Sequence, residues 1–155
     1  MTKDDIQRVL DAYPDVNLHG LPDQIPGWDE VIDEKKEKLL DFFRYKLTEQ
    51  EELCTKICTW LQTVPQQKDI SVIRHEERYI CQYILSPLFG QEVYIGAFIV
   101  AAIHALFKVS IIIPKERYHN YALGINISHQ WLVNEKKRIK AEKGKLIGTS
   151  KSELT

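Results

Sequence analysis

The spacing of apolar residues predicts a chain built mainly of short helices. Apolar side chains recur every three or four positions over residues 2–13, 28–47 and 48–64, which is the period of an amphipathic helix. A capping-box pattern stands at the start of the third stretch. Residues 14–27 hold three prolines and two glycines and are expected to form a linker.

The middle of the chain contains a stretch that is apolar on every side of a helix. A polar connection is expected over residues 65–72, followed by a helix over 74–85 that ends at Ser86-Pro87. Residues 96–107 then have helical length and apolar side chains all round. Such a helix is expected at the buried centre of a fold.

Two short β-branched stretches follow and predict one antiparallel β-hairpin. They cover residues 108–113 and 121–127, and Ser128 is expected to cap a last helix. The fold class expected is therefore α+β, with helices dominating a single domain and the hairpin near the C-terminus. The order of helix, loop, helix and hairpin also matches a winged helix-turn-helix, so a winged-helix-like arrangement is one interpretation.

The expected domain has two parts and a tail. They are a helical N-terminal half over 1–64 and a helix–helix–hairpin–helix core over 72–143, within one globular domain over 1–143, and a frayed tail over 144–155.

The longest apolar run, residues 93–113, has the length of a membrane span. Lys108 would lie well inside a bilayer at a cost of about 2.5–3.5 kcal/mol, and Pro114 ends the run. The run is therefore interpreted as a buried helix followed by a strand. The polar N-terminus does not look like a signal peptide, so a cytoplasmic protein without membrane contact is expected.

Charge is divided unevenly along the chain, and this makes nucleic-acid binding one hypothesis. Residues 1–53 hold 14 acidic and 7 basic side chains, whereas residues 54–155 hold 8 acidic and 14 basic ones. Basic side chains mixed with tyrosine suit contact with phosphates. The candidates are Lys115, Arg117, Tyr118, His119, Lys136, Lys137, Arg138 and Lys140. The helix before the hairpin has no polar face for a DNA groove, which counts against this hypothesis.

No motif assigns a catalytic, cofactor or metal site, so a non-enzymatic protein is expected, with a small unrecognised enzyme as the third hypothesis. Cys54 and Cys58 share one helix face and are interpreted as packing residues, with zinc binding as the alternative. Residues 75–77, of sequence His-Glu-Glu, are interpreted as a capped helix start, with a general-base or metal role as the alternative. His104 is expected in the core, or else in a pocket with Tyr79 or Tyr83.

Three segments together resemble a set of small uncharacterised proteins carried by phages and integrative elements. They are Arg74–Ile80 (RHEERYI), Tyr94–His104 (YIGAFIVAAIH) and Asn126–Ser128 (NIS), and the resemblance covers about residues 72–130. The chain departs from the pattern at two places. Tyr94-Ile95 stands where a Ser-Asn pair is usual, and Leu106-Phe107 stands where Gly-Phe is usual.

The resemblance implies an accessory protein of a mobile element that acts by binding a host or viral protein. Inhibition of a bacterial defence system such as a CRISPR complex is one such activity. An acidic surface that mimics nucleic acid would then face a basic partner. The residues expected at that interface are Asp29, Glu30, Asp33, Glu34 and Glu37. A protein partner is thus the leading hypothesis and nucleic acid the alternative, while the oligomeric state is left open.

Overall fold

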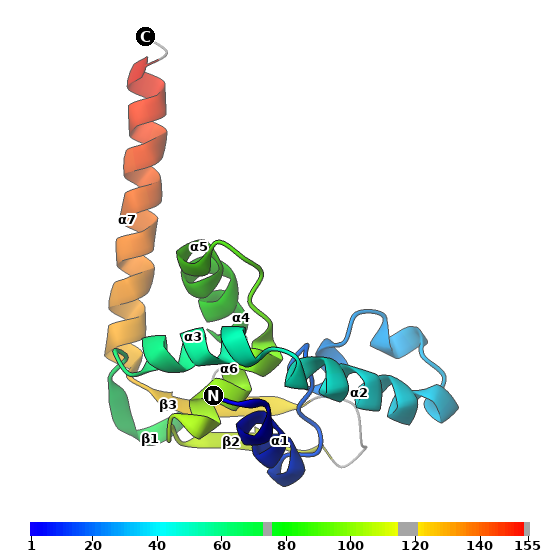
Figure 1. Cartoon of the computed structure of the whole chain (residues 1–155). Helices are drawn as coiled ribbons and strands as arrows, with labels where there is room; N and C mark the ends of the chain where they lie inside the picture. The colour runs from blue at the N-terminus through cyan, green and yellow to red at the C-terminus, as the bar shows by residue number, and fades with distance from the viewer. Residues whose placement is uncertain (73–75, 115–120, 154–155) are drawn as a thin grey trace.

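The computed structural model describes the backbone of residues 1–72, 76–114 and 121–153, and the side chains of residues 1–70, 76–114 and 121–144. The elements of the N-terminal half are α1 (Lys3–Ala12), the 3₁₀ turns η1 (Pro22–Gln24) and η2 (Trp28–Glu30), α2 (Asp33–Thr48) and α3 (Glu51–Leu61). Those that follow are β1 (Gln66–Val72), α4 (Glu76–Tyr79), the π-helical segment η3 (Ile80–Leu85), α5 (Ser86–Phe89), α6 (Ile95–His104), β2 (Val109–Ile112), β3 (Ala122–Ile127) and α7 (His129–Glu153). The fold is a helix-dominated α+β structure, as predicted (Figure 1).

The second helix begins five residues later than predicted. Trp28 lies in the separate turn η2, and the extended backbone of Val31 and Ile32 separates this turn from α2. Trp28 is buried with Ile25 and Leu40 in a small cluster beside the main core. The helical spacing of apolar residues that predicted one long helix therefore comes from two elements, the turn η2 and the helix α2, whose apolar side chains pack in the same cluster.

The polar stretch after α3 is a strand rather than the predicted connection. β1 pairs antiparallel with β3, and the sheet has the order β1-β3-β2. The hairpin of β2 and β3 is as predicted, but the sheet has a third strand. β1 lies at an edge, where polar side chains such as Lys68 and Asp69 reach water, so its composition did not reveal it.

The helical segment from Glu76 also continues past the predicted break. Ser86 and Pro87 form the first turn of α5, a place where proline needs no helical hydrogen-bond partner for its nitrogen. The segment ends at Gly90, whose φ is 64°.

Helix α6 is the buried centre, as the sequence predicted. Every residue from Gly96 to Ala102 is buried, with α3 and α1 packed against the helix. The core side chains of β3 join the same cluster. A helix covered in this way presents no polar face to a DNA groove, so a winged-helix mode of binding through α6 is not supported.

The start of α6 requires glycine. A Cβ atom at Gly96 would lie 1.8 Å from the backbone oxygen of Asn17. The Gly96 N–H also donates to the carbonyl of Leu18 at 3.1 Å. The predicted linker is thus fixed directly against the central helix.

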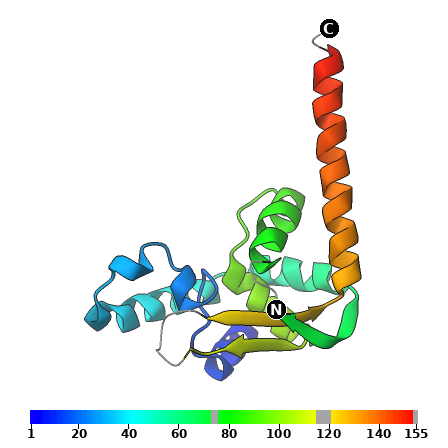
Figure 2. The same ribbon diagram turned by 180° about the vertical axis from the view of Figure 1, so that it is seen from behind.

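Helix α7 projects from the body (Figures 1 and 2). Its base is held by buried Leu132 and by the ring of Trp131, whose centroid lies 5.9 Å from that of Trp60 on α3. The backbone stays helical to Glu153, beyond Gly144, where a frayed tail is expected from the sequence. Among the described residues, no helix is both long and apolar enough to cross a membrane.

Candidate interaction surfaces

The five acidic candidates are exposed and lie together around the start of α2. Asp29 and Glu30 belong to η2, and Asp33, Glu34 and Glu37 to the first turns of α2. Carboxylates in a first turn also complement the positive end of the helix dipole, so stability alone accounts for part of this arrangement.

Lysines in the same stretch reduce its negative charge. Lys35 and Lys38 are exposed between the carboxylates. Lys36 is buried instead: its Nζ lies 3.1 Å from a carboxylate oxygen of Asp33 and 5.3 Å from the centroid of the Trp28 ring. This surface is therefore acidic but mixed, which suits a protein partner better than close mimicry of a phosphate backbone.

Ile32 stands in the middle of these carboxylates, although no sequence pattern pointed to it as a functional residue. Ile32 is the N-cap residue of α2, and its side chain makes no capping hydrogen bond. Isoleucine is among the least favourable residues at this position, where Ser, Thr, Asp or Asn stabilise a helix by about 1 kcal/mol. The side chain is also 56% exposed. An apolar residue placed against both local preference and burial is a candidate contact residue.

Four of the nucleic-acid candidates fall outside the described residues. They are Lys115, Arg117, Tyr118 and His119, in the loop between β2 and β3. The other four lie on α7, and the structure separates them by their partners.

Lys136 contacts the body of the protein. Its Nζ lies 2.6 Å from a carboxylate oxygen of Glu76 and 4.8 Å from the centroid of the Tyr79 ring. Lys143 makes a similar contact with the Tyr83 ring, at 4.7 Å. These two cations fix α7 to α4 and η3, and Glu76 acts as an ion-pair partner rather than only as a helix cap.

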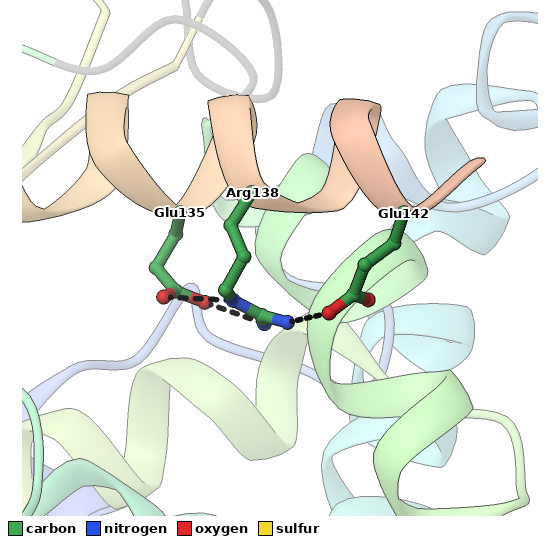
Figure 3. Close-up of polar contacts among 3 residues, drawn as sticks. All are labelled: Glu135, Arg138 and Glu142. Carbon is green, nitrogen blue, oxygen red and sulfur yellow. Dashed lines mark hydrogen bonds and ion pairs between the residues drawn. The ribbon is translucent and has the colours of Figure 1, made fainter. Parts of the chain in front are cut away.

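Arg138 is held between two carboxylates on its own helix (Figure 3). Its guanidinium lies 2.9 Å from Glu135 and 2.8 Å from Glu142. The hydrogen bond and charge of Glu135, with the charge of Glu142, raise the pKa of Arg138. Glu135 and Glu142 would repel a phosphate approaching this guanidinium.

Lys137 and Lys140 are exposed, and within the described part of the chain neither forms an ion pair. Only these two of the four candidates on α7 are therefore available to an incoming anion. Two exposed cations form a weak nucleic-acid surface, because affinity for a phosphate backbone grows with the number of phosphates contacted.

The cysteines and the histidine considered for metal binding or catalysis are either buried in the core or separated from one another. Cys54 lies in the core, where burial raises its pKa to about 12, as expected for a packing residue. Burial and the charge of Glu77 also raise the pKa of Cys81. His104 is exposed at the end of α6, which corrects the expectation of a core position. Tyr79 and Tyr83 instead contact each other, with their ring planes tilted by 40° and their centroids 5.0 Å apart.

His19 is a half-buried titratable group that no sequence motif had indicated. Its ring lies edge-on to those of Phe43, at 4.5 Å, and Tyr94, at 6.5 Å. Desolvation lowers the pKa of His19, while the charge of Glu92 opposes this shift. Among the described residues, no group of three or more His, Cys, Asp or Glu side chains is placed to hold a metal ion.

Comparison of the chain with family models, with curated proteins and with solved structures found no match. The resemblance over residues 72–130 to accessory proteins of mobile elements therefore stays a prediction.

Proposed function

We propose that the protein is a non-enzymatic interaction protein that binds a partner protein through the surface around the start of α2. The surface consists of Ile32 and the carboxylates of Asp29, Glu30, Asp33, Glu34 and Glu37. Exposed Ile32 at an N-cap carries the proposal, because a polar residue there would stabilise α2 and avoid exposing an apolar side chain.

The chemistry of this surface favours a basic partner with an apolar pocket. An apolar anchor surrounded by charged side chains is the common arrangement of a protein interface, with a desolvated centre and a polar rim. The carboxylates would accelerate association with a positively charged surface. A host complex that binds nucleic acid, such as a defence complex attacked by a phage or mobile element, has a basic surface of the charge that these carboxylates would attract.

The test is a pull-down of the partner from a lysate, with variants in which a loss of binding can be distinguished from a loss of stability. Ile32→Ser supplies an N-cap and removes the anchor, so we expect a free energy of unfolding higher by about 1 kcal/mol and loss of the captured partner. Leu88→Ser is the matched control, because Leu88 is also exposed but lies on α5. The protein should be attached to the resin through its C-terminus, which lies away from α2 and leaves the surface around the start of α2 free (Figure 1).

Two results of the capture experiment in a bacterial lysate would contradict the proposal. One is that the wild-type chain retains no stoichiometric partner. The other is that Ile32→Ser retains the partner as well as the wild-type chain does. Reversing charge in Glu30→Lys/Glu34→Lys should weaken capture most at low salt, because exposed charges are screened as salt rises.

The alternative is a nucleic-acid-binding regulator, supported by exposed Lys137 and Lys140 on α7. A salt-titrated gel shift with duplex DNA and with RNA separates it from the first proposal. Binding that weakens steeply with salt and is lost in Lys137→Glu/Lys140→Glu would support it. No shift at low salt would remove it.

A further inference from the structure

The two edges of the sheet differ in their protection against pairing with another strand. β1 is irregular between Gln66 and Ser71 and carries exposed Lys68 and Asp69, features that discourage edge-to-edge contact. β2 is regular over its four residues, Val-Ser-Ile-Ile, and holds no charged side chain. The β2 edge therefore lacks the devices that protect β1.

The backbone of β2 has hydrogen-bonding groups directed away from the sheet. The Asn126 N–H donates to the Lys108 carbonyl at 3.1 Å. Every second residue of an antiparallel strand makes the backbone hydrogen bonds to a given neighbour, so Ser110 and Ile112 also direct their backbone groups toward β3. Val109 and Ile111 then direct their N–H and C=O groups to the open edge. Within the described residues, no fourth strand pairs with this edge.

Exposed apolar side chains flank both ends of this edge. Ile112 and Ile113 at its C-terminal end are 50% and 61% exposed. Leu106, three residues before the strand, is 83% exposed. Figure 2 shows the adjacent outer face of the sheet, over which no helix of the described part lies.

Leu106 is also in a conformation that disfavours its side chain. It directly follows Ala105, the C-cap of α6, and has a φ of 67°, in the left-handed region in which glycine is favoured. The helix end is closed in the usual way, since the Phe107 N–H donates to Ala102 and the Leu106 N–H donates to Ile103. Glycine would make the same turn without strain and without exposing a leucine, so folding does not account for this residue.

We infer that β2 pairs antiparallel with β2 of a second copy of this chain, which joins two three-stranded sheets into one. In the register that matches the outward groups, Val109 of one copy lies opposite Ile111 of the other, and Ser110 lies opposite Ser110. This proposal is independent of the surface around the start of α2.

Charge along the edge is compatible with self-pairing. Residues 109–113 hold no ionisable side chain, so a two-fold axis places no like charges opposite one another. Lys108 begins this region, but its Nζ donates to the carbonyl of Lys68 at 2.9 Å and so reaches across the sheet toward β1. The ammonium group is thus turned away from the open edge.

The size of the contact is consistent with a weak dimer rather than an obligate one. A standard interface buries about 800 Å² on each partner, more than two four-residue strands provide alone. Leu106, Ile112 and Ile113 of both copies add apolar area at the two ends of the paired strands. Dimer formation should therefore depend on protein concentration.

Sedimentation equilibrium over a range of concentrations tests the proposal. The wild-type chain should move from monomer to dimer, while Ser110→Lys, which sets two ammonium groups opposite each other, should remain monomeric. Leu106→Gly should shift the equilibrium toward monomer while its thermal midpoint rises, a pair of results that a folding defect cannot produce. A wild-type chain that stays monomeric throughout, or a Ser110→Lys chain that dimerises equally, would overturn the proposal.

The register is tested by cross-linking. In the Cys58→Ser background, Ser110→Cys should form a disulfide between two chains under mild oxidation, because opposed residues of a non-hydrogen-bonded pair have close Cβ atoms. The matched control is Lys68→Cys on the β1 edge, which should remain uncross-linked. Equal cross-linking of the two variants would contradict pairing through β2.

Discussion

Helices α6 and α7 place very different sequences in the same secondary structure. α6 has ten residues and is buried along most of its length, whereas α7 has 25 residues and projects into solvent beyond its first turns (Figure 1). Contacts on all sides hold α6, but Trp131, Lys136 and Lys143 are among the few side chains that hold α7 to the body. We therefore expect the stability of the fold to depend on α6, and the outer turns of α7 to tolerate change.

The largest expected effect is a glycine substitution compared between the two helices. Gly96→Ala should lower the free energy of unfolding by about 3 kcal/mol or more, because its methyl group would overlap the backbone of Asn17. Gly144→Ala meets no atom within 4 Å and should stabilise α7 by up to about 1 kcal/mol. Urea denaturation measures the loss at Gly96, and the temperature dependence of the helical circular dichroism signal below the main transition measures the gain at Gly144, because the outer turns of α7 are expected to open before global unfolding. Equal changes in stability for the two variants would contradict a buried, central α6 and an exposed, projecting α7.

The base of α7 should show a smaller effect. Trp131→Ala removes the ring contact with Trp60 and should lower the free energy of unfolding by about 2 kcal/mol, less than for a fully buried tryptophan. Near-ultraviolet circular dichroism should lose part of its tryptophan signal. A variant with unchanged stability would show that α7 is not anchored at this contact.

A still smaller effect is expected for the cation that fixes α7 to the body. Lys136→Met keeps the apolar stem but loses the contacts with Glu76 and Tyr79, at an expected loss of about 1 kcal/mol. Lys137→Met is the matched control and should leave thermal stability unchanged, since Lys137 is exposed. Thermal denaturation compares the two, and the same midpoint for both variants would argue against the Glu76 contact.

The smallest expected effect is a pH dependence at His19, beside the start of α6. Because the folded state lowers the pKa of His19, its neutral form stabilises the fold above the unfolded pKa of about 6.5. This stability should be lost as the pH falls below 6.5 and through the folded pKa. His19→Gln should flatten this part of the curve of unfolding free energy against pH. An unchanged curve would assign the dependence to another group.

The sequence predicted most of the helical architecture because apolar spacing determines which faces are buried. It identified α6 and the division of the run over residues 93–113 into a helix and a strand. It missed β1, because an edge strand with polar side chains looks like a loop, and it placed Trp28 in a helix rather than a turn. The sequence showed where the acidic and basic candidates lie along the chain, but not which of the basic side chains form ion pairs with carboxylates of the same protein. Arg138 and Lys136 show that this depends on neighbours in space.

Hydrogen exchange followed residue by residue tests most directly whether α6 is the stable centre and α7 a projecting arm. The amides of Phe98 to Ala102 should exchange only through global unfolding, with an exchange free energy equal to that from denaturation. The amides of residues 140–144 on α7 should exchange at much lower free energy. Protection of these α7 amides equal to that of α6, or rapid exchange within α6, would contradict the account.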